Sequence, residues 1–299
     1  MKKTYKFDDD FRAWARALQF AYREEILNDF NEEKAPKVLL SDENAKHGLI
    51  FCDGFRGSIL KKVGNVSNEM TKNMLRSEHI PYNMFTPLEE MPEFAKNVFS
   101  DIIGVTIKEV EMPILIEYAG ERNKSDYLND GTSFDAFVRY RTVDGRRGAI
   151  GIEVKYTENE YRLGKTESDS INNPEGKYAQ MTAESGYFID ELDVKMFLEA
   201  NHLRQIWRNH ILGYSMKKRG DCDLIHHVHL YPRNNVHFHN HALPEYQKLL
   251  SDAGRESFKA VTYEDYAALL EKHGNDKKIK DWVKYLRARY LGENFSTKI

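Results

Sequence analysis

The chain of 299 residues contains 41% hydrophobic and 30% charged residues, a composition typical of a globular protein that forms one large domain or two small ones. No stretch approaches the roughly 18 consecutive apolar residues of a membrane-spanning helix, and no apolar segment follows the basic N-terminus, so we expect a cytoplasmic protein without a membrane partner. The two cysteines, Cys52 and Cys222, exclude a disulfide framework and a cysteine-based zinc site, and a formal net charge of −3 excludes a global positive field, so any contact with nucleic acid has to be local.

The first third of the chain is predicted to be mainly helical. Apolar residues at helical spacing predict a helix over residues 10–30, irregular structure is expected over 52–64, and a second helix over 67–79 should end before Pro81. No linker or repeat divides the sequence. We therefore expect an N-terminal helical region (residues 1–104) that packs on a core (residues 105–299) as one continuous globular unit.

The pattern changes to strands after residue 104. Strands are predicted over 105–110 and 114–118, interrupted at Pro113, which favours an edge or a strand start because proline cannot donate to a ladder. The clearest strands are 134–142 and 149–156, joined by Asp144-Gly145, a hairpin signal. The fold class predicted is α/β, a mixed sheet with an antiparallel hairpin, flanked by helices.

The last part of the chain alternates between the two kinds of element. A polar loop is expected over residues 159–177, and then a long helix over 193–217 with one apolar face. A strand pair is predicted over 224–231 and 236–239, followed by a strand over 258–261. Thr262 with Asp265 indicates the capped start of a helix, and a final helix carries Trp282.

The hairpin holds the residues with the clearest chemical potential. Because strand side chains alternate, Glu153 and Lys155 point away from the apolar face, and Asp135 lies on the neighbouring strand. Two carboxylates on rigid strands are suited to a hard divalent cation such as Mg²⁺, and a lysine beside them can polarise water or stabilise charge on a phosphate. The alternative from the residues alone is a salt-bridge set on a half-exposed strand.

Three segments extend this pattern into a family resemblance. Asp135 followed 18 positions later by Glu153-Val154-Lys155 resembles the D…(D/E)xK signature of the PD-(D/E)xK, restriction-endonuclease-like superfamily. Residues 129–137, 151–158 and 204–210 also resemble segments of uncharacterised bacterial putative restriction endonucleases, so that the likeness covers residues 117–290. Phe134 stands where the motif's proline would be. The resemblance implies a restriction-endonuclease-like core.

The resemblance also implies a role for each residue of the signature. Asp135, Glu153 and the carbonyl of Val154 would bind Mg²⁺ or Mn²⁺, and Lys155 would assist the nucleophile. A two-residue Asp144-Gly145 turn would put Asp135 opposite Val154 and leave Glu153 and Lys155 on the wrong face. We therefore expect an odd loop centred on Gly145, or a bulge, with Asp135 opposite Lys155 and diagonal to Glu153.

Further residues are candidates for supporting roles. Glu117 resembles an acidic position of related sequences and is expected as a further ligand or as a partner of a metal-bound water, and a helical Glu78 is a weaker candidate. Gln205, on the polar face of the long helix, is expected near the site. The nucleic-acid contacts are assigned to three arginines, with Arg208 suited to a bidentate phosphate contact: Arg139, Arg141 and Arg208.

The leading hypothesis is therefore a Mg²⁺-dependent endonuclease that hydrolyses DNA phosphodiester bonds in restriction, defence or repair. The alternative is a nucleic-acid-binding protein that keeps the fold without cleavage. A third reading is a zinc or nickel site on paired strands, built from six histidines: His226, His227, His229, His237, His239 and His241. The sequence leaves the oligomeric state open, a homodimer included.

Overall fold

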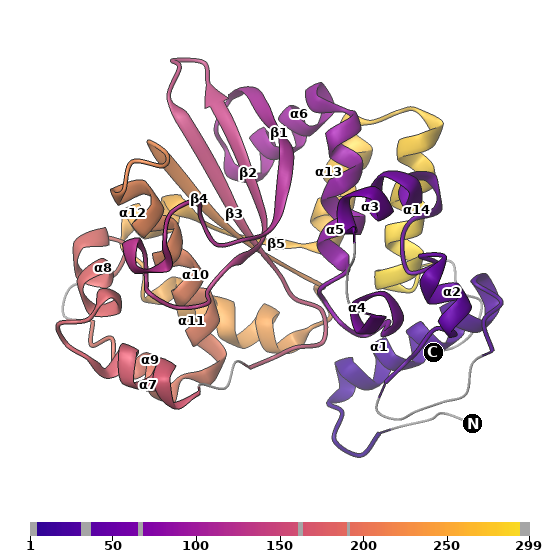
Figure 1. The fold of residues 1–299 in the computed structure, drawn as a ribbon, viewed down its shortest axis with the longest axis horizontal. Coiled ribbons are helices and arrows are strands. Elements are labelled where there is room, and N and C mark those ends of the chain that lie inside the picture. The colour runs from indigo at the N-terminus through magenta and orange to yellow at the C-terminus, as the bar shows by residue number, and fades with distance from the viewer. Residues whose placement is uncertain (1–4, 31–36, 65–67, 161–163, 190–191, 294–299) are drawn as a thin grey trace.

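A computed structural model describes residues 5–30, 37–64, 68–160, 164–189 and 192–293 of the chain. At its centre lies one mixed sheet in the order β1-β2-β3-β4-β5, in which β1, β2 and β3 are antiparallel and β3, β4 and β5 are parallel (Figure 1). The strands are β1 (Ile107–Tyr118), β2 (Phe134–Thr142), β3 (Arg147–Val154), β4 (Leu224–Tyr231) and β5 (Phe258–Thr262). The predicted fold class, a mixed sheet with an antiparallel hairpin, is confirmed.

Helices flank the sheet (Figure 1). Those before the sheet are α1 (Asp10–Ala21), α2 (Asp42–Lys46), α3 (Arg56–Val63), α4 (Asn68–Lys72), α5 (Ile80–Phe85) and α6 (Pro92–Ile103). Those between β3 and β5 are α7 (Lys165–Asn172), α8 (Lys177–Ser185), α9 (Met196–Glu199), α10 (Asn201–Lys218), α11 (Leu243–Lys248) and α12 (Asp252–Ser257). After β5 come α13 (Tyr263–His273) and α14 (Lys277–Leu291). In the described part of the chain, no helix is long and apolar enough to cross a membrane.

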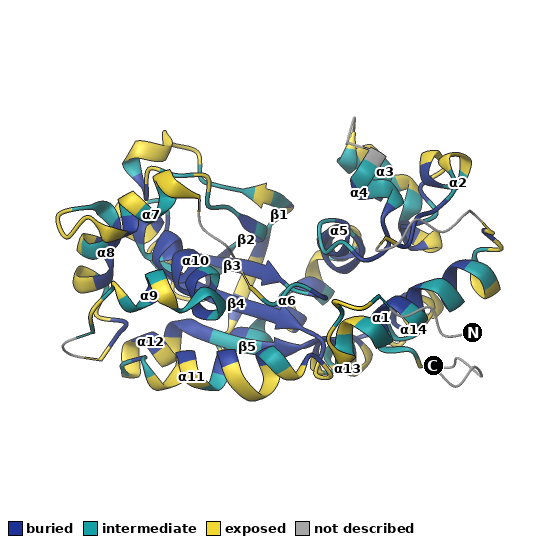
Figure 2. Ribbon diagram, turned by 90° about the horizontal axis from the view of Figure 1, so that it is seen from below, coloured by how far each residue is buried: buried dark blue, intermediate teal, exposed yellow. Residues whose placement is uncertain are grey.

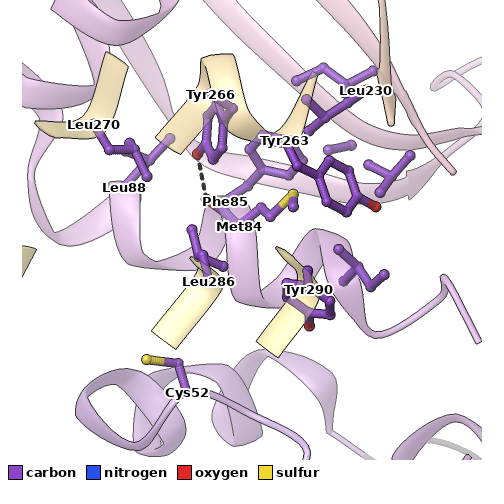
Figure 3. Packing of buried hydrophobic residues seen from close by; sticks show 14 of the residues in the cluster. Cys52, Met84, Phe85, Leu88, Leu230, Tyr263, Tyr266, Leu270, Leu286 and Tyr290 are labelled. Carbon is purple, nitrogen blue, oxygen red and sulfur yellow. Dashed lines mark hydrogen bonds between the residues drawn. The ribbon is translucent and has the colours of Figure 1, made fainter. Parts of the chain in front are cut away.

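The two faces of the sheet contribute to two separate hydrophobic clusters, because successive strand side chains point to opposite sides. Ile150 belongs to the first cluster, with residues of the N-terminal helices and of α13 and α14, whereas Ala149 belongs to the second, with α10 and α11. In Figure 2 the central strands and α10 are mostly buried. Figure 3 shows the first cluster where α5, α13 and α14 meet, with the Tyr266 hydroxyl donating to the Met84 carbonyl over 2.7 Å.

Several predicted elements are found where the sequence placed them. The helix expected over 10–30 is present as α1, continued by a π-helix (Tyr22–Ile26), and the side chain of Asp9 accepts from the Arg12 N–H at its start over 2.7 Å. Thr262 Oγ1 accepts from the Asp265 N–H over 3.1 Å and caps α13, as predicted. Pro113 lies in β1, which is an edge strand of the sheet.

Other predictions about elements are wrong. The irregular segment 52–64 contains α3, and the helix expected over 67–79 is limited to α4. The expected loop 159–177 contains α7, and its residues 161–163 lie outside the described part. The helix expected over 193–217 is divided into α9 and α10 at Ala200. A strand was expected over residues 236–239, but residues 237–239 belong to a π-helix (His237–Ala242) that leads into α11, with Val236 as its N-cap residue.

The β2–β3 hairpin has a loop with an odd number of residues, as expected, but the loop is centred on Asp144 rather than on Gly145. The Thr142 N–H donates to the Arg146 carbonyl and the Gly145 N–H to the Thr142 carbonyl, each over 3.0 Å, so the loop is residues 143–145. Gly145 has a φ of 88° and takes the last loop position, as in three-residue hairpin loops with a final glycine. The register pairs Ala136 with Ile152. Continued by one residue, it places Asp135 opposite Glu153 rather than opposite Lys155.

Candidate active site

Asp135 and Glu153 come together where β2 and β3 leave the antiparallel ladder. The Asp135 carboxylate accepts a hydrogen bond of 2.6 Å from the Val154 N–H on the neighbouring strand. This contact fixes one oxygen of Asp135 against the backbone between Glu153 and Lys155. The three residues of the predicted centre therefore share one small region at the ends of two rigid strands.

Glu153 is the most enclosed member of the site, with a side chain that is only 2% exposed. Its Oε1 lies 2.6 Å from Lys155 Nζ and accepts from Gln205 Nε2 over 2.5 Å, and its Oε2 accepts from Asn209 Nδ2. Gln205 and Asn209 are one helical turn apart on α10, so they face the same carboxylate. The expectation that Gln205 lies near the site matches its position.

The electrostatics of the site are those of two crowded carboxylates. Burial and the neighbouring Glu153 raise the pKa of Asp135 well above its usual value. Burial also raises the pKa of Glu153, although the Lys155 ammonium opposes this. Burial lowers the pKa of Lys155, but Glu153, Asp135 and Glu158 outweigh it and raise that pKa to about 12. The ammonium is therefore held by negative charge, and the carboxylates together still favour a further cation.

Glu117, at the end of β1, lies within electrostatic reach of this group. It has a φ of 53°, and Ser133 Oγ donates to its carboxylate over 3.1 Å. Burial raises the pKa of Glu117, and Glu153 and Glu78 raise it further. Glu78 is in a turn before α5 rather than in a helix. The acidic character of the site thus extends to a third and a fourth carboxylate from other elements.

The donor set fits a hard divalent cation better than a softer metal. Carboxylate and carbonyl oxygens are available from Asp135, Glu153 and Val154, and oxygen donors with several retained waters are what Mg²⁺ requires. In the described part of the chain, no three or more His, Cys, Asp or Glu side chains are arranged as a metal cage. A cation would therefore be held by the two carboxylates with main-chain oxygen and water.

The arginines assigned to nucleic acid have carboxylate partners in the structure. Arg208 is 4% exposed, with its guanidinium 2.8 Å from Asp130 and 3.0 Å from Glu167, and it donates to the Tyr178 hydroxyl. A phosphate contact by Arg208 would require these ion pairs to break. Arg139 pairs with Glu121 and Arg141 with Glu111, and both lie farther along β2 than Asp135.

The histidines do not form the paired strands that a zinc or nickel site would need. His226, His227 and His229 lie on β4 and are buried, whereas the other three belong to the π-helix that replaces the second predicted strand. His229 is the register partner of Glu153. Burial lowers the pKa of His226 to about 4 and that of His227 to about 3. These imidazoles are neutral parts of the sheet interior.

The sequence analysis missed two residues that organise the site. Asn209 was not predicted, although its position one turn after Gln205 on the same helix was a signal for a shared target. Glu158, directly after β3, accepts from the N–H groups of Tyr156, Thr157 and Ser77 over 3.1–3.2 Å. No pattern in the sequence indicated that this carboxylate would join the end of β3 to the segment before α5.

Comparison with protein families identifies the class to which the chain belongs. The model of the PD-(D/E)XK nuclease superfamily matches residues 6–292, nearly the whole chain. The chain therefore belongs to the PD-(D/E)XK nuclease superfamily. No curated protein and no solved structure matched it. Membership indicates nuclease activity on a nucleic-acid substrate, and nucleases of this superfamily typically use divalent metal ions.

Proposed function

We propose that this protein is a Mg²⁺- or Mn²⁺-dependent endonuclease that hydrolyses DNA phosphodiester bonds, in restriction, defence or repair. The observation that carries the proposal is the convergence of Asp135, Glu153 and Lys155 at the ends of β2 and β3, with the Val154 N–H holding Asp135. Superfamily membership supplies the nuclease class. The choice of DNA and of internal cleavage belongs to the proposal.

Each residue has a role that follows from its position. Asp135, Glu153 and the carbonyl of Val154 would hold the cation, which when bound supplies charge stabilisation at the scissile phosphate and a more acidic water. Lys155, with its ammonium 2.6 Å from Glu153, orients the attacking water or stabilises negative charge on the phosphate. Glu117 would hold a water of the cation's shell. Gln205 keeps the Glu153 carboxylate in its orientation through their hydrogen bond.

The test is cleavage of plasmid and linear DNA by purified protein with Mg²⁺, with Mn²⁺ and with EDTA. Asp135→Ala, Glu153→Ala and Lys155→Ala should each reduce cleavage by roughly 100-fold or more, because the first two remove a ligand of the cation and the third removes the ammonium that acts on the water or the phosphate. Asp252→Ala is the matched control, since its carboxylate is fully exposed on α12. Circular dichroism checks that each variant is folded.

The outcomes separate the nuclease from the alternative. Metal-dependent cleavage that persists in all three site variants would show that Asp135, Glu153 and Lys155 do not form the catalytic centre. A wild-type protein that binds DNA but cleaves nothing with any divalent metal would instead be a nucleic-acid-binding protein on the same fold. Cleavage of RNA in place of DNA would retain the chemistry and change the substrate.

A further inference from the structure

A cleft of about 470 Å³ opens beside the candidate active site. One side of it is formed by the site and the end of β3, including Lys155, Thr157 and Gln205. The opposite side comes from the N-terminal region, which the family signature does not include, and it contains three basic residues: Arg12, Lys37 and Arg76. The cleft therefore brings cations from three separate N-terminal segments to the edge of the catalytic residues.

The three cations are accessible, unlike Arg208. Their side chains are 44%, 47% and 42% exposed for Arg12, Lys37 and Arg76, respectively. Each has a carboxylate neighbour, which is Asp8 at 3.4 Å for Arg12, Glu69 at 2.6 Å for Lys37 and Glu78 for Arg76. The pairs of Lys37 and Arg76 are exposed and contribute only about 0–1 kcal/mol, whereas Asp8 is buried and keeps its shorter ion pair of 2.6 Å with Arg16. A phosphate group can therefore replace these partners at small cost.

Hydrogen bonds hold this side of the cleft in a fixed position relative to the site. Glu158 follows β3 and accepts from the Ser77 N–H over 3.2 Å, next to Arg76. Asn159 Nδ2 donates to Asp9 over 2.6 Å, at the start of the helix that carries Arg12. The backbone positions of Arg12 and Arg76 relative to the end of β3 are thus set by the fold.

We propose that this cleft is the path of a DNA strand to the candidate active site, and that Arg12, Lys37 and Arg76 contact its backbone phosphates. The inference rests on the proposed function and adds the route of the substrate. A protein with a net charge of −3 has to bind a polyanion through local cations, and this group adjoins the site directly. Three carboxylates also line the cleft, those of Glu78, Glu158 and Glu160; Arg76 offsets the first, and the second accepts backbone N–H groups.

The inference is tested by binding rather than by cleavage. Fluorescence anisotropy of a labelled oligonucleotide is measured with the full chain in EDTA, over about 50–200 mM salt. Each of Arg12→Gln, Lys37→Gln and Arg76→Gln should weaken binding similarly for unrelated sequences. Each should also reduce the slope of log K against log salt by about 0.7–0.9, because one phosphate contact is lost. In the triple variant, the magnitude of this slope should fall by about 2–3.

Two control variants remove exposed cations elsewhere: Arg255→Gln on α12 and Lys272→Gln on α13. Both should leave the salt slope unchanged. A triple variant with the wild-type slope and affinity, or a wild-type protein without salt-dependent binding, overturns the inference. Binding that depends on the three cations in a protein that does not cleave DNA would keep the inference and reject the nuclease. DNA cleavage by the wild-type protein, together with unchanged DNA binding by the triple variant, would keep the nuclease and reject the inference.

Discussion

The carboxylate of Glu153 is positioned by side chains of two different elements. Lys155 follows directly after β3 and neutralises part of the charge of Glu153, while Gln205 and Asn209 come from α10 and donate to one oxygen each. A buried carboxylate with few partners would take up a proton, because burial disfavours the charged form. The amides of α10 therefore orient Glu153, and the hydrogen bond from Asn209 opposes the rise in its pKa that burial causes. This makes Asn209 a positioning residue of the site.

We expect Asn209→Ala to reduce metal-dependent cleavage by roughly 10- to 100-fold, the range found when partners of metal ligands are removed. The reason is that one Glu153 oxygen loses its hydrogen bond inside the protein. Cleavage rates as a function of metal concentration measure the effect, which should include a higher metal requirement. Asn97→Ala, at an exposed position of α6, is the control. Equal rates for both variants at every metal concentration would show that Asn209 has no such role.

At the level of elements, Gly151 in β3 leaves space for the ring of Phe134 on the neighbouring strand β2. A Cβ at Gly151 would lie 2.3 Å from the ring of Phe134, the residue directly before Asp135. We expect Gly151→Ala to destabilise the protein by about 1–3 kcal/mol, as overpacking does, and to lower cleavage because Phe134 has to move. Urea unfolding and the DNA assay measure the two effects.

The matched control is Gly131→Ala, where a Cβ would have no neighbour within 4 Å. It should change neither stability nor cleavage by a comparable amount. If Gly151→Ala is as stable and as active as wild type, then the position of Phe134 does not constrain Asp135.

The elements that the sequence predicted correctly are those with local signals. Strands β2 and β3 have alternating apolar residues, and the first turn of α13 has the Thr262 cap. The wrong element in the histidine segment has a physical explanation. Alternating histidines imitate a strand, but Phe238, Ala242 and Tyr246 are buried at a spacing of four residues, which is helical.

The missed helix α3 depends on contacts that the sequence does not reveal. Two glycines, Gly54 and Gly57, indicated an irregular segment. In the structure, Phe55 packs edge-on against the ring of Trp282 at 5.8 Å, and Ile59 is fully buried. Tertiary packing with a helix more than two hundred residues away therefore overrides the local preference. The spacing of Asp135, Glu153 and Lys155 is a local signal that the sequence shows, whereas the link from Glu158 to Ser77 depends on tertiary contacts.

At the scale of the whole molecule, the interior of the sheet contains imidazoles that are neutral. His226, His227 and His229 on β4 and His210 on α10 are buried, and burial lowers the pKa of each below its usual value. Protonation then favours the unfolded chain, in which a histidine has a pKa of about 6.5. The stability that the neutral histidines contribute is complete above about pH 6.5 and is lost as the pH falls toward their pKa values in the folded protein. The raised pKa values of Asp135 and Glu153 act in the opposite direction.

A single substitution isolates the histidine contribution from that of the carboxylates. The pKa of His227 is about 3 in the folded protein, so between about pH 6 and pH 4 the unfolded chain binds one more proton at this residue. We expect His227→Leu to reduce the slope of the unfolding free energy against pH in this window by up to about 1.4 kcal/mol per pH unit. Urea unfolding at pH 7, 6, 5 and 4 gives the slope, with His47→Leu at an exposed position as the control. Equal slopes for wild type and His227→Leu would mean that His227 is protonated in the folded protein, and the neutral interior of the sheet would then need a buried anion to accompany it.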